Sequence, residues 1–121
     1  MIDVVAHCVY YVSTMQAALG QLEVVVLMGV LHLAHDANGS AVRDVIERRT
    51  GRPISRGAVY VTLDRLEAKH LLQSRLIDAP NVRGGAKRLF RVTAQGRKAL
   101  REAMDTIARM HDGLKPALGD L

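Results

Sequence analysis

The sequence predicts a mainly α-helical fold with one small β-hairpin, and three patterns support this prediction. Three segments are rich in apolar residues at lengths or spacings typical of helices: residues 21–35, 41–49 and 56–70. Residues 71–77 and 87–93 instead alternate with period two, and the loop between them holds one Pro, one Asn and two Gly. An amphipathic segment, 94–114, then follows Thr93, a residue type that often caps helices. The expected order is helix, helix, turn, helix, hairpin, helix.

The size and composition of the chain predict one soluble domain. The chain has 121 residues, of which 49% are hydrophobic, so we expect a small core that a partner subunit could complete. Cys8 is the single cysteine, which excludes an intramolecular disulfide and fits a reducing cytoplasm. The N-terminus lacks the basic start of a signal peptide. The apolar run 22–34 is shorter than the roughly 20 residues that a membrane span needs, so no membrane partner is expected.

Capping residues predict where the second helix begins and ends. Ser40 is the expected N-cap, because a serine side chain can accept a hydrogen bond from a free amide of the first turn. Val42, Val45 and Ile46 would then share one buried face. Gly51 suits the left-handed position that follows a helix.

The third helix is expected to be half buried. Ser55 is its predicted N-cap, and Val59, Leu63 and Leu66 recur at the spacing of a core-facing stripe. A helical wheel places a mixed set of residues on the opposite side: Gly57, Val61, Asp64, Arg65 and Ala68.

Basic residues are concentrated in the middle of the chain. The net charge of the whole chain is +5, but residues 51–101 hold 12 Lys/Arg against 3 Asp/Glu, whereas the segments before and after are each net acidic. A localised basic block is typical of a surface that binds a polyanion. The alternative is a solvated basic surface with no partner.

A helix followed by a hairpin with a cationic loop predicts binding to double-stranded DNA. The helix could lie in the major groove while the hairpin reaches along the backbone. Gly84 and Gly85 would let backbone amides approach a phosphate closely, and Arg83, Lys87 and Arg88 would supply charge. The alternative is a plain hairpin loop, in which glycine is common.

Roles on the third helix follow from position. Ser55 and Arg56 mark the helix start, where free amides favour phosphate. Gly57 and Val61 would let the helix approach base edges. The remaining candidates are Arg65, which could reach a phosphate or a guanine; Tyr60, which could contact DNA or belong to the core; and Asp64, which should pair with a neighbour or face away.

The last helix carries an apolar seam that predicts a homodimer. Its members alternate by four and three: Leu100, Met104, Ile107, His111 and Leu114, continued by Leu118 and Leu121. Regular pairing should fade near residue 112, because Gly113 and Pro116 interrupt the helix. The alternative is a helix that packs on its own domain. A twofold dimer would place two reading helices about 34 Å apart on a near-palindromic site.

No enzyme, metal site or cofactor is expected. His32 and His35 have a spacing that can chelate, but nothing in the sequence completes the site, and His7 and Cys8 lie in the least predictable segment. No nucleophile–base set, carboxylate pair or phosphate loop is present in the sequence.

Three blocks of the sequence together resemble the PadR-type transcriptional regulators: "LGQLEVVVLMGVL", "GAVYVTLDRLEAKHLL" and "RGGAKRLFRVTAQGRKAL". The resemblance runs from about Leu19 to Met110. It implies a winged helix-turn-helix, a homodimer with a C-terminal dimerisation helix, and repression of target promoters. It also places Ser55, Tyr60, Thr62 and Arg65 on the recognition helix and residues 83–88 on the wing.

The resemblance divides the chain into three parts: residues 1–18 as an N-terminal extension that could form an extra helix, 19–94 as the DNA-binding domain, and 95–121 as the dimerisation helix. It also implies a small-molecule effector at the dimer interface, whose identity the sequence does not show. The family usually has Gly where this chain has His70, and often an aromatic residue at the position of Asn38. The alternative function is a winged-helix module that binds an acidic protein.

Overall fold

The computed structural model describes residues 19–119 and confirms the predicted fold class. The first 18 residues, and with them the predicted extension, lie outside the described residues, as does the end of the apolar seam at Leu121. The elements in chain order are α2 (Gln21–Leu33), a 3-10 turn η1 (Ala34–Asp36), α3 (Gly39–Thr50), α4 (Arg56–Ala68), β1 (Leu72–Asp78), β2 (Ala86–Val92), α5 (Ala94–His111) and α6 (Lys115–Leu118).

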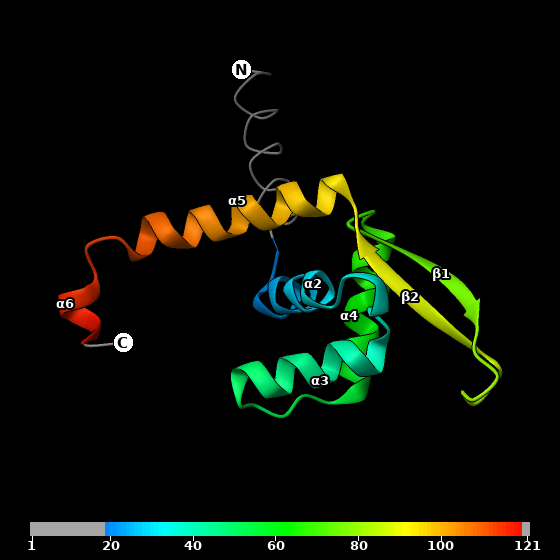
Figure 1. The fold of residues 1–121 in the computed structure, drawn as a ribbon. Helices are drawn as coiled ribbons and strands as arrows, with labels where there is room; N and C mark the ends of the chain where they lie inside the picture. Colours follow the sequence, from blue (N-terminus) through cyan, green and yellow to red (C-terminus); the bar gives the residue numbers. More distant parts are fainter. Residues whose placement is uncertain (1–18, 120–121) are drawn as a thin grey trace, which may run out of the picture.

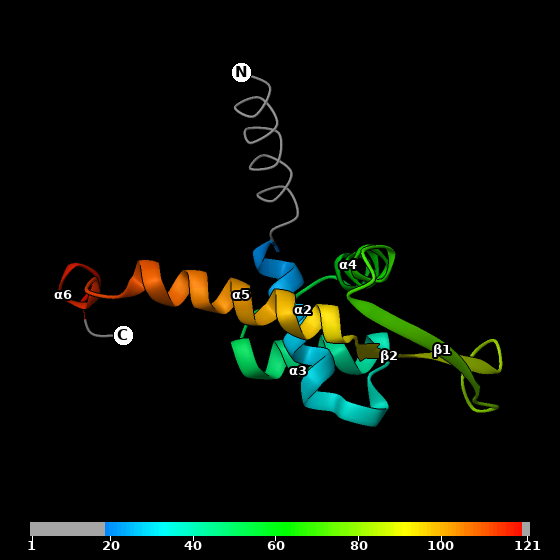
Figure 2. The ribbon, with the colours of Figure 1, turned by 90° about the horizontal axis from the view of Figure 1, so that it is seen from above.

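The described part of the chain has a helical body with two projections (Figures 1 and 2). Helix α2 lies at the centre of the body and contacts α3, α4 and α5. The β1–β2 hairpin extends from the body on one side, and α5 extends on the other side with α6 at its far end. The tip of the hairpin and the outer half of α5 therefore have little of their own domain to pack against.

The predicted buried stripes of the second and third helices are confirmed. The core cluster joins these stripes to residues of α2, the hairpin and the first half of α5: Val26, Leu27, Val30, Val42, Val45, Ile46, Val59, Leu63, Leu66, Leu72, Phe90, Val92 and Leu100. Burial of this apolar surface supplies the main driving force for folding.

The start of α3 differs from the prediction, whereas its end matches. Asn38, not Ser40, is the N-cap: its backbone is extended and its side-chain oxygen accepts a 3.0 Å hydrogen bond from the Ala41 amide. Asn38 stands two residues before Ser40 and its side chain already accepts a hydrogen bond from a free amide of the first turn, so the helix begins at Gly39. Gly51 follows the helix with φ of 69°, as expected for a left-handed cap.

The two strands pair antiparallel, with Leu72 opposite Val92 and Asp78 opposite Ala86. Each strand is displaced by one residue from its predicted bounds, which shortens the loop to residues 79–85. On its other edge, β2 receives a further backbone contact, because the Phe90 amide donates to the Ala37 carbonyl at 2.9 Å. The base of the hairpin is thereby tied to the segment between η1 and α3.

A partly buried ion pair joins the start of α2 to the end of α4. The Glu23 carboxylate accepts hydrogen bonds from the Gly20 amide at 3.0 Å and from Lys69 Nζ at 2.7 Å. Burial alone would raise the pKa of Glu23, but these hydrogen bonds and the charges of Lys69 and Arg65 outweigh it, so that the pKa is lowered. Glu23 therefore stays ionised and fixes α4 against α2.

His70 ends α4 in the left-handed conformation, with φ of 64°. The His70 amide donates to the Glu67 carbonyl and the Leu71 amide donates to the Leu66 carbonyl, both at 2.9 Å. These two bonds form a Schellman motif, in which the left-handed residue is usually glycine. The helix thus ends where the usual glycine would stand, and His70 adopts the strained backbone.

Replacing His70 with glycine is expected to stabilise the fold by roughly 0.5–1 kcal/mol. Relief of left-handed strain contributes about 1–2 kcal/mol, and the greater freedom of glycine in the unfolded chain offsets part of it. Urea unfolding should show a higher midpoint at an unchanged m-value. Ala68→Gly, in the last turn of the same helix, should do the opposite by a similar amount. Destabilisation by His70→Gly would contradict the assigned backbone strain.

Candidate nucleic-acid interface

Helix α4 begins as predicted and leaves one side open to solvent. Ser55 is its N-cap, and the Ser55 hydroxyl oxygen accepts a 3.1 Å hydrogen bond from the Ala58 amide. Arg56, Gly57 and Val61 are exposed, and Val61 keeps 56% of its surface in contact with solvent. No heavy atom would lie within 4 Å of a Cβ at Gly57. A small, partly apolar surface is therefore available along the first two turns of α4.

Hydrogen bonds fix the turn between α3 and α4. Arg43 Nε donates to the Ile54 carbonyl at 2.8 Å, and the Ile54 amide donates to Glu47 Oε1 at 3.1 Å. Both side chains come from α3, so the carbonyl and the amide of the residue just before the α4 cap are both held by α3. The angle between the two helices is therefore set independently of any ligand.

Tyr60 is partly buried and partly exposed, so it matches neither a pure core residue nor a free DNA contact. It is 37% exposed, and its ring covers the start of α3 so closely that a Cβ added to Gly39 would lie 2.5 Å from ring carbons. The ring packs α4 against α3, while one edge remains accessible. Gly39 is required here by this close approach.

Two residues of α4 are placed differently from the rest of the predicted set. Thr62 is only 3% exposed, and its hydroxyl donates to the Ala58 carbonyl at 2.7 Å, so its side chain faces the core rather than a ligand. Arg65 is exposed, but its charge helps to lower the pKa of Glu23 at the start of α2. The spacing of Thr62 from Val59 and Leu66 could have placed it on the buried stripe, whereas the environment of Arg65 depends on the position of α2.

The loop at the tip of the β1–β2 hairpin, the wing of the predicted fold, requires Gly84 and Gly85 because of its backbone conformation. Gly84 has φ of 90° and Gly85 has φ of 74°, a pair of left-handed residues that side chains would strain. The Gly85 carbonyl accepts a 2.9 Å hydrogen bond from the Ala79 amide, and the Gly85 amide donates to the Val82 carbonyl at 2.8 Å. These two bonds close the loop. Arg83 is exposed at this tip. The glycines therefore shape the turn, whether or not a phosphate approaches.

Arg88 does not extend into solvent as a free phosphate contact. It donates to Asp64 of α4 at 2.8 Å, to Ser74 of β1 at 3.0 Å, and also to Glu67 of α4. Its guanidinium also lies over the Phe90 ring, 4.7 Å from the centroid. Arg88 therefore binds the hairpin to α4, and Asp64 is paired, as predicted.

The ionisation of the groups around Arg88 supports this network. The hydrogen bond from Ser74 lowers the pKa of Glu67; burial opposes this shift, and Arg88 adds to it. Burial would lower the pKa of Arg88, but hydrogen bonds to Asp64 and Glu67 outweigh burial and raise it. Glu67 and Arg88 thus stay charged. The sequence spacing from Asp64 to Glu67, opposite a cation in a following strand, is the signal that could have revealed the network.

The predicted dimer seam divides into a buried and an exposed part. Leu100 is only 5% exposed and belongs to the core of its own domain, because α2 lies beneath the first half of α5. Leu100 is therefore not available to a partner. The other seam residues are exposed: Met104, Ile107, His111 and Leu114, followed by Leu118. Helix α5 ends at His111, close to the predicted end of regular pairing.

The described residues hold no candidate metal site. Within residues 19–119, no three His, Cys, Asp or Glu side chains are grouped so that they could hold an ion. His32 and His35 line two different hollows. Among the same residues, no helix has the length and apolar character required to cross a membrane.

Comparison with known proteins agrees with this architecture. Residues 27–102, more than half of the chain, match the Transcriptional regulator PadR-like family. The chain is 38% identical to Transcriptional regulator Rv3488 of Mycobacterium tuberculosis over 89 residues, which cover 65% of this chain and 78% of that protein.

Two crystal structures show the same fold. A PadR-family regulator from Eggerthella lenta is 25% identical, with a TM-score of 0.66 over 98% of this chain and 96% of that one. A PadR-family regulator from Clostridium difficile is 20% identical, with a TM-score of 0.61 over 79% of this chain and 98% of that one. The chain therefore belongs to the PadR-like family of transcriptional regulators.

Proposed function

We propose that the protein is a sequence-specific repressor that binds a near-palindromic DNA site as a homodimer. Membership of the PadR-like family implies DNA-binding regulation. The observation that carries the finer proposal is the open side of α4, where small and apolar residues stand next to the free amides of a helix start. Such a surface can enter a major groove without a steric or electrostatic barrier.

The proposed reading surface is smaller than the predicted one. It contains Ser55, Arg56, Gly57, Tyr60 and Val61, with Arg65 at its edge. Thr62 is left out because it is buried. On the wing, we propose that Arg83 and Lys87 contact phosphates, while Arg88 holds the wing in place.

Val61→Gln is expected to reduce sequence preference more than general DNA affinity. The exposed methyl groups of Val61 can contact a thymine methyl, and one such base contact contributes roughly 1–3 kcal/mol of discrimination. The ratio of affinities for a selected site and a scrambled duplex should fall about tenfold. Fluorescence anisotropy on both duplexes measures this ratio, using DNA from upstream of the protein's own gene as the source of the site.

Arg83→Ala is the matched control for the reading helix. Loss of one phosphate contact should weaken binding to both duplexes by the same factor and leave the ratio unchanged. Identical behaviour of the two variants would contradict the division between reading helix and wing. A wild-type protein whose affinity for duplex DNA barely depends on salt would instead favour the acidic-protein alternative.

The exposed half of the α5 seam is proposed as the dimer interface. Ile107 is 63% exposed and Met104 is 49% exposed, although both are large apolar residues. Ile107→Asp should therefore give a monomer in sedimentation analysis and weaken operator binding by about 100-fold or more, because two linked contacts become one. Thr106→Asp places the same charge one residue away, outside the seam, and should remain dimeric. A wild-type monomer, or a dimeric Ile107→Asp variant, would exclude this interface.

A further inference from the structure

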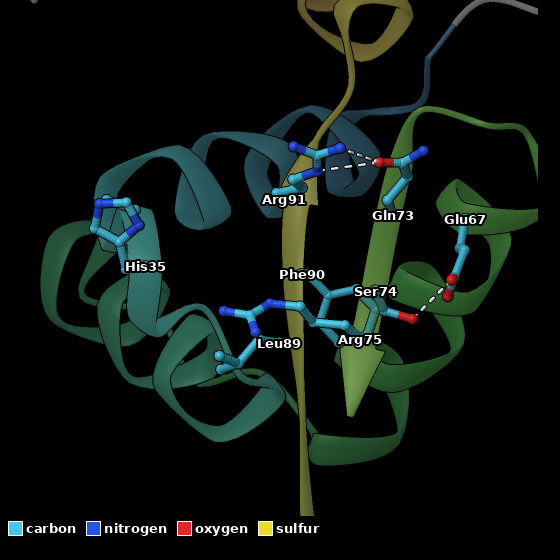
Figure 3. Close-up of a pocket in the computed structure, with 9 residues that line it drawn as sticks. His35, Glu67, Gln73, Ser74, Arg75, Leu89, Phe90 and Arg91 are labelled. Atoms are coloured by element: carbon cyan, nitrogen blue, oxygen red, sulfur yellow. Dashed lines mark hydrogen bonds between the residues drawn. The ribbon is translucent and has the colours of Figure 1, made fainter. Parts of the chain in front are cut away.

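A hollow lies on the face of the hairpin that is turned away from α4. Its volume is about 460 Å³. Side chains of a strand alternate between its two faces. Ser74 and Arg88 point to α4, where they bond to Glu67, so Arg75, Leu89 and Arg91 belong to the opposite face. Figure 3 shows this face: Arg75 extends across β2 to the side where Leu89 and His35 of η1 lie, whereas the Arg91 guanidinium is directed towards Gln73.

The hollow is positively charged, and its two arginine side chains are available to bind an anion. Arg91 donates from Nε and Nη2 to the Gln73 side-chain oxygen at 3.0 and 2.6 Å, which orients the guanidinium but does not neutralise it. Neither Arg75 nor Arg91 forms an ion pair with any residue in the range 19–119. Leu89, only 8% exposed, gives the hollow an apolar floor.

The single acidic residue that lines the hollow does not cancel this charge. Glu67 lies beyond β1, on the α4 side, where its carboxylate accepts hydrogen bonds from Ser74 and Arg88 (Figure 3). The wing therefore separates its charges between two faces. On the α4 face, Arg88 is paired with carboxylates, whereas the cations of the opposite face are not.

The length of this cationic surface fits a chain of phosphates better than one small anion. Arg91 and Lys87 lie on the same face of β2, four residues and thus about 13 Å apart, and Arg75 stands opposite Leu89 between them. Arg83 continues the series at the wing tip. A single phosphate could contact only part of this row, whereas a nucleic-acid backbone could contact all of it.

We propose that the hollow binds DNA backbone phosphates through Arg75 and Arg91, with His35 as a third donor. The face of the wing that is turned away from α4, together with the wing tip, would then contact the DNA backbone. This inference rests on the proposed function, because it assumes that the protein binds a duplex. It adds a contact surface that the recognition helix and the wing tip do not include.

The salt dependence of DNA binding by the full chain tests the proposal. Each lost phosphate contact should make the slope of log affinity against log salt less negative by about 0.9. Arg75→Gln/Arg91→Gln removes two contacts from each subunit of the proposed dimer and should therefore change the slope by about 3.6. Arg97→Gln/Arg101→Gln removes the same charge from exposed positions of α5 and should leave the slope unchanged. Arg75→Lys/Arg91→Lys should restore most of the wild-type slope.

Each outcome separates this proposal from the proposed function. A wild-type slope in Arg75→Gln/Arg91→Gln would overturn the hollow as a DNA contact and leave the regulator function intact. Absence of any DNA binding by the wild type would overturn the function first. In a last experiment, the protein is titrated with inorganic phosphate while the NMR resonances of the His35 imidazole are monitored. Saturable shifts together with an unchanged DNA slope would mean a small-anion site and would reject the DNA backbone as the ligand.

Discussion

Replacing Gly96 with alanine is expected to destabilise the protein by about 3 kcal/mol. Gly96 lies in the first turn of α5, where a Cβ would collide with the Leu71 carbonyl oxygen and lie 2.8 Å from Val92 Cγ1. The same Leu71 carbonyl oxygen accepts a 3.1 Å hydrogen bond from the Thr93 amide. It cannot move without breaking the junction between the hairpin and α5. Overpacking of this kind typically costs about 1–3 kcal/mol, and more where backbone must move.

Urea unfolding at a fixed protein concentration measures this loss. Gly57→Ala is the matched control, because the same methyl group would meet nothing within 4 Å there. Its effect should lie between no change and about 1 kcal/mol of stabilisation, since alanine favours helix more than glycine does. Equal effects of the two substitutions would mean that the close contact at Gly96 is not present in solution.

Arg88→Ala is expected to weaken DNA binding about tenfold without changing its salt dependence. The substitution leaves Asp64 and Glu67 without their cation on the side of α4 that carries the proposed reading surface. The wing then loses its link to the helix, so that DNA binding must also order the wing, at a cost in free energy. No phosphate contact is lost, so the slope of log affinity against log salt should stay the same. The fold should lose about 1–2 kcal/mol, a figure reduced for the partial exposure of these pairs.

Arg83→Ala provides the opposite signature. It should reduce the magnitude of the slope by about 1.8, since one contact is lost from each subunit of the proposed dimer. It should leave stability unchanged, because Arg83 is exposed at the wing tip. Arg88→Lys should give an intermediate loss of affinity, since one ammonium cannot match the several donors of a guanidinium. An Arg88→Ala variant with full stability and a shallower slope would show that Arg88 contacts phosphate after all.

The helices and their buried faces could be predicted because they depend on local chemistry. Val59, Leu63 and Leu66 are spaced for one face of a helix in any tertiary context, and all three are fully buried. Ser55, Thr93 and Gly51 act as predicted at helix ends, since capping needs only nearby amides or a left-handed backbone. The Asn38 cap was missed because two capping residues stand two positions apart, and only the path of the preceding turn selects one.

The environments of charged and seam residues could not be predicted in the same way. Arg88 looked like a wing cation because sequence shows only that it is basic. Its role as a link depends on Asp64 and Glu67, which the fold brings to it from 24 and 21 residues away. Leu100 fits the same heptad as Ile107, yet α2 covers the first and leaves the second exposed.

Residue periodicity, capping residues and composition were enough to predict the order of the elements, the buried stripes of α3 and α4, the concentration of basic charge and the family. The packed fold was needed to show which cations are neutralised, which face of the hairpin carries those without an ion pair among residues 19–119, and where the seam on α5 ceases to be core. The reason is physical: helical and strand periodicity acts between neighbours in the chain, whereas pairing and desolvation act between neighbours in space.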